Sequence, residues 1–321
     1  MMTTVIITPS HTTAADIQQG ALKATPADLV NALHAAFGDH HVRAVHAKGV
    51  ILEGSFTPDD HAYQLTQANH LQKQASKVLV RFSDFTGIPD IPDNAGAANP
   101  RGFAIKFIMP DSSTTDIVGH SFNGFPTANS DQFRELLLAI AASGPDAAKP
   151  TPLDQFLTTH PVAKIFLTTQ HLPQSYAGIS YFGVNSFKFT NAEGVAHFVR
   201  YRFVPEEGEK LLTPEQYEKE SDDYLVDEIK IHVAANPVRF TMYAQVAEKD
   251  DRIEDPSIAW PDSRTLVRLG LIEITGIADN SVVADKQLFF IPNNVPNGIE
   301  PADPMLTFRS HTYPISWQGR Q

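Results

Sequence analysis

The spacing of apolar residues changes along the chain, and with it the type of element that the sequence predicts. A helix is predicted over 26–37, because Thr25 suits the N-cap, Pro26 suits the first helical position and Gly38 suits the end. Segments further along are rich in Val, Ile, Phe and Tyr, several with the two-residue alternation of strands. The predicted strands are 43–56, 101–109, 179–190, 195–204, 238–247 and 266–276.

These strands follow one another through turns rather than alternating with helices. Residues 188–203 are predicted to form a hairpin whose turn is 191–194. Strands joined in this way favour an antiparallel sheet, and six or more of them indicate a closed barrel with helices outside it. The pattern therefore predicts an α+β fold. Further helices are predicted at about 129–142, 152–167, 213–224 and 303–313.

Four prolines fall in the segment 292–304, which excludes a regular helix and a central strand there. We expect an extended connection leading to the last helix. The sequence contains neither an internal repeat nor a low-complexity tract. Residues 1–321 are predicted to form a single domain, with 1–24 as an irregular N-terminal arm.

Composition and charge exclude several classes of partner and of metal site. The formal net charge of −12 argues against a nucleic-acid partner, which needs a basic surface. The chain has no cysteine, which excludes disulfides, thiolate nucleophiles, iron–sulfur clusters and thiolate-ligated haem. No segment approaches the roughly 18 to 20 apolar residues of a membrane span, and the N-terminus lacks the basic segment of a signal peptide. We expect a soluble protein of the cytoplasm, or of the periplasm if a signal peptide has been removed.

Individual residues carry little functional information when each is considered alone. His46 begins a predicted apolar strand, where a histidine is more often a core residue bonded to a backbone carbonyl. Arg309 and Tyr313 are four residues apart, so a helix brings them to one face, as in many surface cation–aromatic pairs. Pro314 is expected to end that helix just after Tyr313. Three further histidines have unhelpful spacing for a metal site and are interpreted as solvated or structural: His40, His41 and His171.

The order of several segments carries more information than any of them alone. Residues 43–49, which include Val45-His46-Ala47-Lys48-Gly49, resemble the strand that carries the distal histidine of haem catalases. Residues 309–314 resemble the segment that carries their proximal tyrosine. The resemblance runs from about 40 to 317. The other blocks that resemble this family, in the same order, are 81–83 with 99–107, 116–119, 187–194 and 296–306.

The resemblance implies a catalase-type antiparallel barrel of about eight strands with surrounding helices. Full catalases continue well beyond the proximal tyrosine into a wrapping connection and a helical domain, whereas this chain ends eight residues after Tyr313. What remains is the bare barrel, which is most similar to the short catalase-related peroxidases, or minicatalases. The segments that interlock full catalases into tetramers are absent, so we expect a monomer or a homodimer.

The resemblance also implies a site for haem of the b type. Tyr313 would bind the iron, as tyrosine does in catalases, and Arg309 would donate to its phenolate oxygen. On the distal side His46 would move a proton from one peroxide oxygen to the departing one, oriented by Ser83. The other contacts with haem are assigned to Arg43 and Arg81, which suit its propionates, and to Val45 and Phe125.

One position departs from the family pattern. The family pattern has a peroxide-holding asparagine two residues after the Val-Gly of this distal strand, and counting without a gap places Ser121 there, after His120. Asn123 is the candidate substitute if the strand bulges. This departure, together with the missing helical domain, favours a peroxidase over a catalase. In a peroxidase, peroxide oxidises the haem and an organic electron donor reduces it again.

Two other functions stay open on the sequence. The same barrel could bind a lipid hydroperoxide and rearrange it, as the allene oxide synthases related to catalase do. A non-catalytic barrel that carries haem or another apolar ligand would need Tyr313 but not His46. The expected ligands are therefore haem, a peroxide and an organic reductant, with neither a nucleic acid nor a membrane as partner.

Overall fold

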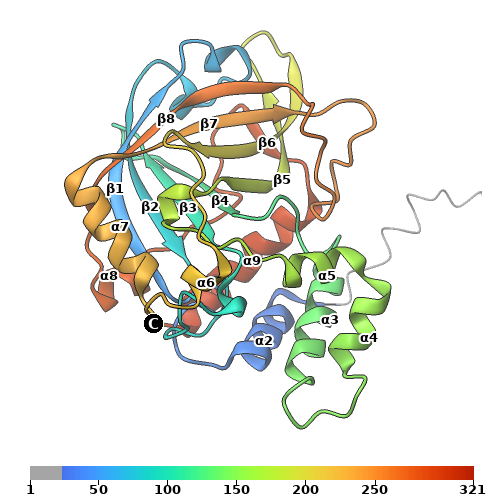
Figure 1. Ribbon diagram of the computed structural model, residues 1–321. Helices are drawn as coiled ribbons and strands as arrows, with labels where there is room; N and C mark the ends of the chain where they lie inside the picture. Colours follow the sequence, from blue (N-terminus) through green and yellow to red (C-terminus); the bar gives the residue numbers. More distant parts are fainter. Residues whose placement is uncertain (1–23) are drawn as a thin grey trace, which may run out of the picture.

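The barrel predicted from the strand pattern forms the centre of the computed structural model, which describes residues 24–321 (Figure 1). Its strands are antiparallel and follow the order β4-β3-β2-β1-β8-β7-β6-β5, and a pairing of His120 in β4 with Phe182 in β5 closes the sheet. This confirms the predicted barrel of about eight strands. The strands are β1 (Gly49–Pro58), β2 (Ser76–Ser83), β3 (Gly102–Ile108), β4 (Thr114–His120), β5 (Tyr181–Thr190), β6 (Ala196–Pro205), β7 (Val238–Val246) and β8 (Leu266–Ile277).

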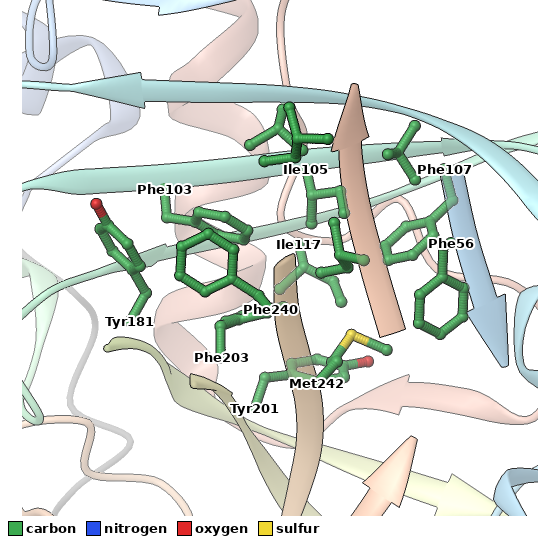
Figure 2. Close-up of a cluster of buried hydrophobic side chains, with 14 of the residues drawn as sticks. Phe56, Phe103, Ile105, Phe107, Ile117, Tyr181, Tyr201, Phe203, Phe240 and Met242 are labelled. Carbon is green, nitrogen blue, oxygen red and sulfur yellow. The ribbon is translucent and has the colours of Figure 1, made fainter. Parts of the chain in front are cut away.

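Aromatic and aliphatic side chains fill the inside of the barrel, as Figure 2 shows. Side chains on a strand alternate between the two faces, so every second residue points inward. On β3 the inward residues are Phe103, Ile105 and Phe107, all of which are buried. The Phe103 ring centroid lies 4.6 Å from that of Phe203 and 5.0 Å from that of Tyr181. The barrel interior is therefore a packed core, and the outward faces of its strands are available to form a site.

The predicted strands agree well with the observed ones, with one exception at the start. The predicted strand 43–56 begins too early, because residues 43–48 form an irregular segment and β1 starts at Gly49. The predicted hairpin turn is confirmed: the Asn191 N–H donates to the Val195 carbonyl, and Gly194 adopts a φ of 80°. The pattern does not predict β2 or β4, whose outward residues include arginine, serine, aspartate and histidine.

The proline-rich segment 292–304 contains one short strand, β9 (Ile299–Pro301), which pairs with β5 at the edge of the sheet. The prediction that this segment is neither a helix nor a central strand is confirmed. An edge position suits Pro301, which has no N–H to donate to a further strand. The predicted irregular arm, 1–24, lies outside the described residues except for Ala24.

Helices cover the barrel from outside, and α2 to α5 gather on one side of it (Figure 1). The first, α2 (Pro26–Phe37), has the predicted bounds, because Thr25 and Asp28 form a capping box. Its buried face packs against Leu137 of α3 and Phe308 of α9. Within residues 24–321 no helix is long and apolar enough to cross a membrane. The remaining helices are α3 (Ser130–Ala141), α4 (Pro152–Thr159), α5 (Pro161–Thr168), α6 (Pro214–Tyr217), α7 (Tyr224–Ala235), α8 (Val282–Gln287) and α9 (Pro304–Gly319).

Two helix predictions are wrong in their bounds. The predicted helix 152–167 is divided into α4 and α5, because Pro161 lacks an N–H and holds the preceding residue out of the helical conformation. The predicted helix 213–224 is limited to the four residues of α6. The following helix, α7, is missed, because its Val and Ile residues are as typical of strands as of helices.

The last helix also differs from the prediction that it ends at Tyr313. Helix α9 continues through Pro314 to Gly319, although an interior proline costs about 3 kcal/mol. Contacts of its final turn offset this cost. The Trp317 ring stacks on Phe289 with centroids 5.2 Å apart, and Arg320, which caps the helix, donates to the Leu288 carbonyl at 2.9 Å.

Candidate functional site

A cavity lies outside the barrel, between the outward face of β2, β3 and β4 and the helices α2 and α9. Its walls combine apolar side chains with a few polar groups. The apolar residues that line it include Leu33, Ala44, Val45, Ala104, Val118, Phe289, Phe290 and Trp317, and the polar ones are Arg43, His46, Arg81, Ser83, Thr312, Tyr313, Ser316 and Arg320.

Tyr313 lines the cavity from α9, and Arg309 is bonded to its phenol oxygen. One turn of helix separates the two residues, as their spacing predicts, and the Arg309 Nε donates to the Tyr313 Oη at 3.2 Å, with a second, shorter bond from Nη2. The other guanidinium nitrogen donates to the Asn185 Oδ1 at 2.6 Å. Asn185 in turn donates to the Asp303 carboxylate at 2.6 Å. A guanidinium can only donate hydrogen bonds, so in this series of bonds the Tyr313 oxygen is an acceptor.

His46 lines the same cavity from the barrel side. Its Nδ1 lies 2.9 Å from the Asp84 carbonyl oxygen and 3.1 Å from the Ser83 Oγ. A carbonyl can only accept, so Nδ1 carries the proton and Nε2 is left as a proton acceptor. Burial, followed by the neighbouring Arg81, lowers the pKa of His46 to about 3. The imidazole is therefore neutral at physiological pH, and the lone pair of Nε2 is available to accept a proton.

Three arginines surround one end of the cavity. Arg81 donates to the backbone carbonyls of His46 and Ala47, each at 2.9 Å, and its Nε donates to the Asp285 carboxylate at 3.0 Å. Arg43 pairs with the same carboxylate. Burial raises the pKa of Asp285, but Arg81 and Arg43 outweigh it and lower that pKa overall. Arg320 is the third arginine at this end of the cavity. Three guanidinium charges and one carboxylate charge give a net charge of +2, which can attract an anionic ligand.

The structure brings together most of the residues that the sequence analysis assigned to a site. Val45, Ser83, Arg43, Arg81 and Arg309 lie in or directly beside the cavity. Arg81 is buried and Arg43 is largely buried, and both pair with Asp285. By contrast, Phe125 and Asn123 do not line it among the described residues. Ser121 is buried elsewhere, where its Oγ accepts from the backbone N–H of Arg101.

Arg320 and Asp285 were missed by the sequence analysis. Arg320 is seven residues after Tyr313, which on a helix means nearly two turns and the same face. That spacing is visible in the sequence, but a helix that ends at Pro314, as expected, would not include Arg320. Asp285 is more than 200 residues from its partner Arg81, and no local pattern connects them.

The residues present fit a haem group. Apolar walls suit a porphyrin, and the arginine-rich end suits its carboxylates. An acceptor oxygen on one side and an imidazole on the other suit an iron-bound group, because tyrosine is a known haem ligand. Groups of three or more His, Asp or Glu that could bind a metal ion by themselves are not found within residues 24–321.

Comparisons with known proteins agree with this geometry. The family model described as Catalase matches residues 24–320. The catalase-related peroxidase of Mycolicibacterium paratuberculosis is 35% identical over 298 residues, which cover 91% of this chain and 93% of that protein. The catalase-related peroxidase of Synechococcus elongatus is 31% identical over 303 residues, which cover 92% and 88%.

Longer catalases match over a smaller part of their length. Catalase-2 of Bacillus subtilis is 27% identical, with 84% of this chain and 42% of that protein covered. Among solved structures, a fungal catalase has a TM-score of 0.77 at 23% identity, with 87% of this chain and 59% of that chain covered. Catalase A from Saccharomyces cerevisiae has a TM-score of 0.75, also at 23% identity, with 61% of that chain covered. The chain therefore spans about three fifths of these solved catalases, and at such identity they show the fold alone.

Proposed function

The chain belongs to the catalase family, and from this premise we propose that it is a haem-dependent peroxidase. It would reduce hydrogen peroxide with electrons from an organic donor. The observation that carries the proposal is that one cavity contains a neutral imidazole, an arginine-bonded phenol and a cluster of arginines: His46, Tyr313, Arg43, Arg81 and Arg320. The two relatives named catalase-related peroxidase, which match along nearly their whole length, support it.

Haem bound in this cavity would supply the redox-active iron that reacts with peroxide and is then reduced by the donor. Tyr313 would hold the iron through its phenol oxygen, and the hydrogen bonds from Arg309 would favour the charged form of that oxygen. Arg43, Arg81 and Arg320 would hold the two propionates, whose charges match the two positive charges left at that end of the cavity.

His46 would do the proton chemistry. Its Nε2 would accept a proton from one oxygen of peroxide and return it to the oxygen that departs, so that the leaving group is water. The fixed bond from Nδ1 to the Asp84 carbonyl keeps Nε2 available for this exchange. A protein that only carries haem has no need of such a base, so the preset tautomer favours the catalytic function over the carrier.

Stopped-flow absorption spectroscopy of the haem-loaded protein tests the proposal. We expect hydrogen peroxide to oxidise the haem rapidly and an organic donor to reduce it again, with little dioxygen released. His46→Ala is expected to slow the oxidation about 100-fold to 10,000-fold, because general acid–base catalysis contributes on that order. The control His197→Ala, near the start of β6 and not among the residues that line the cavity, should leave the rate unchanged.

Two outcomes contradict the proposal. Rapid conversion of a fatty-acid hydroperoxide without any reductant, and slow reaction with hydrogen peroxide, would indicate a rearranging enzyme. No change in the haem spectrum with either peroxide would indicate a carrier.

A further inference from the structure

Trp317 lies on α9 between two residues of the proposed haem site. It follows Tyr313 by four residues and precedes Arg320 by three, so the three side chains lie near one face of the helix. Each of them lines the cavity. The Trp317 indole is therefore placed between the proposed iron ligand and the arginine-rich end of the cavity.

The same indole also reaches the surface of the protein. Its side chain is partly exposed, and its Nε1–H donates to the backbone carbonyl of Gln287 at 3.3 Å in an exposed hydrogen bond. Gln287 and the next residue of α9, Gln318, are both exposed. Phe289 stacks on the indole, with centroids 5.2 Å apart and planes inclined by 27°, and restricts its orientation. One conjugated ring therefore connects the cavity with solvent.

The chemistry of the cavity wall sets Trp317 apart. Indole and phenol give up an electron far more readily than phenyl, imidazole or alkyl groups, and the chain has no thiol. Among the described residues that line the cavity, the aromatic side chains are three phenylalanines, His46, Tyr313 and Trp317, without a methionine. Tyr313 is assigned to the iron. Trp317 is therefore the oxidisable side chain of this wall that is left to carry electrons.

An electron can cross such a ring while its donor stays at the surface. The donor then has to contact the exposed part of the indole, and flat aromatic molecules stack favourably on an aromatic ring. Phenols and aromatic amines combine a flat ring with an electron that is readily removed. The position of Trp317 therefore favours donors of this chemical class.

We propose that Trp317 is the residue through which an aromatic donor, a phenol or an aromatic amine at the surface, reduces the haem. This inference rests on the proposed haem function and deepens it, because it names the class of the organic donor and the place where its electrons enter the protein.

Electrons and protons balance over one turnover. Hydrogen peroxide takes two electrons from the haem protein and, with two protons, becomes two molecules of water. The Trp317 indole returns one electron at a time and releases its Nε1 proton, which leaves an indolyl radical. A phenol then gives its O–H hydrogen, as one electron and one proton, to that nitrogen. Each peroxide thus converts two phenols into two phenoxyl radicals, and the indole is restored each time.

Peptide mapping by mass spectrometry tests for the radical without measuring turnover. When the haem-loaded protein is treated with hydrogen peroxide in the absence of a donor, the indolyl radical has time to react with dioxygen. We therefore expect oxygen to be added at Trp317, and guaiacol, a small phenol, should prevent this when it is present. Trp260 is the other tryptophan of the chain and is buried, with its Nε1–H donating to the Arg252 carbonyl at 2.9 Å. It should stay unmodified.

Stopped-flow spectroscopy of variants separates the two halves of the reaction. Trp317→Phe keeps a ring to stack on Phe289 but removes the oxidisable group. Hydrogen peroxide should oxidise its haem at the rate of the parent, whereas the fast reduction by guaiacol should be lost. Trp317→Tyr restores an oxidisable ring and should regain most of that reduction rate. Trp260→Phe makes the same chemical change at a residue that does not line the cavity and should behave like the parent.

The outcomes separate this inference from the proposed function. A parent protein that takes up no haem, or whose haem does not react with hydrogen peroxide, would overturn both. A reactive parent in which Trp317 gains no oxygen would overturn the role of Trp317 alone, and so would a Trp317→Phe protein that guaiacol reduces as fast as the parent. Loss of reduction in both Trp317→Phe and Trp317→Tyr would also overturn it, because the shape of the indole rather than electron transfer would then be responsible.

Discussion

His46 is held by its backbone and its surroundings as much as by its side-chain bonds. Its φ of 58° lies in the left-handed region, which residues other than glycine adopt rarely. Two hydrogen bonds to the backbone of His46 maintain this conformation. The His46 N–H donates to the Phe85 carbonyl, and the Arg81 guanidinium donates to the His46 carbonyl, each at 2.9 Å. The direction of the imidazole is therefore determined by the fold.

Substitution of Gly102 should disturb this direction directly. In Gly102→Ala the new methyl group would clash with the His46 Nδ1 and the Ser83 Oγ, so the imidazole has to shift. A displacement of about 1 Å can cost a hundredfold in rate, so we expect oxidation of the haem by hydrogen peroxide to slow about tenfold to a hundredfold. The measurement is the stopped-flow rate constant.

Gly144→Ala is the matched control, because nothing lies within 4 Å of a Cβ added there. It should react with peroxide like the parent. Equal rates in Gly102→Ala and the parent would contradict the proposed importance of His46 orientation.

At the scale of residues, sequence reasoning found the members of recognisable motifs and missed the rest. His46, Ser83, Arg309 and Tyr313 were found because each belongs to an ordered block that resembles the catalase family. Asp285 and Arg320 were missed because they join the arginine cluster through an ion pair and a hydrogen bond between distant segments, which the sequence alone does not show.

At the scale of elements, α9 organises one whole side of the cavity. Arg309, Tyr313, Ser316 and Arg320 lie along it at spacings that keep them near one face. Its continuation past Pro314 is what brings Arg320 into the arginine cluster. The sequence predicted the start of this helix but not its end, because the packing of Trp317 and the bond of Arg320 to Leu288 are tertiary contacts.

Helix α2 packs against α9 and contributes Leu33 to the cavity wall, and its N-cap offers a test of element stability. The Thr25 Oγ1 accepts from the Asp28 N–H at 3.2 Å. Thr25→Ala removes this acceptor and is expected to lower the free energy of unfolding by about 1 kcal/mol, measured by urea denaturation. Thr25→Ser keeps the hydroxyl and should stay close to the parent. Equal stability of the Ala and Ser variants would contradict the capping role.

Elements were predicted best where the local signals agreed with one another. The bounds of α2 follow from a cap, a proline and a glycine, and the strand β7 follows from strict alternation. Strand β2 was missed although Val78, Val80 and Phe82 alternate with outward residues that are mostly polar. Strand β4 was missed because its two large apolar residues, Ile117 and Val118, are adjacent and give no alternation.

At the scale of the whole molecule, three buried histidines link stability to pH. Burial is the main cause that lowers the pKa of His46, His70 and His120, each to about 3, from the ordinary value of 6.5. Below pH 6.5 the unfolded chain binds protons at these rings while the folded protein does not. The free energy of unfolding should therefore fall as the pH decreases from about 6.5 toward 3.

His70 allows this contribution to be measured away from the cavity. At pH 5 a histidine shifted in this way lowers the free energy of unfolding by about 2 kcal/mol relative to neutral pH. In His70→Leu that loss is absent, so the decrease in stability between pH 7 and pH 5 should be smaller than in the parent by about this amount. Urea denaturation at the two pH values checks it, and equal decreases in the two proteins would contradict a neutral His70.

The barrel itself could be predicted from the sequence, because successive β-rich segments joined by turns leave few other arrangements. The cavity could not, since it lies between the outward faces of β2 to β4 and two helices more than 260 residues apart in the chain. Only the family resemblance indicated that these distant segments meet at one site.

The absorption spectrum of the haem-loaded protein, compared with that of Tyr313→Phe, tests the central claim most directly. We expect the parent to show the ferric spectrum typical of tyrosinate-ligated haem. Tyr313→Phe should lose that spectrum or fail to retain haem, because no other side chain on α9 places an oxygen beside Arg309 in the described structure. An unchanged spectrum in Tyr313→Phe, or a parent that binds no haem, would contradict the claim that this cavity holds haem through Tyr313.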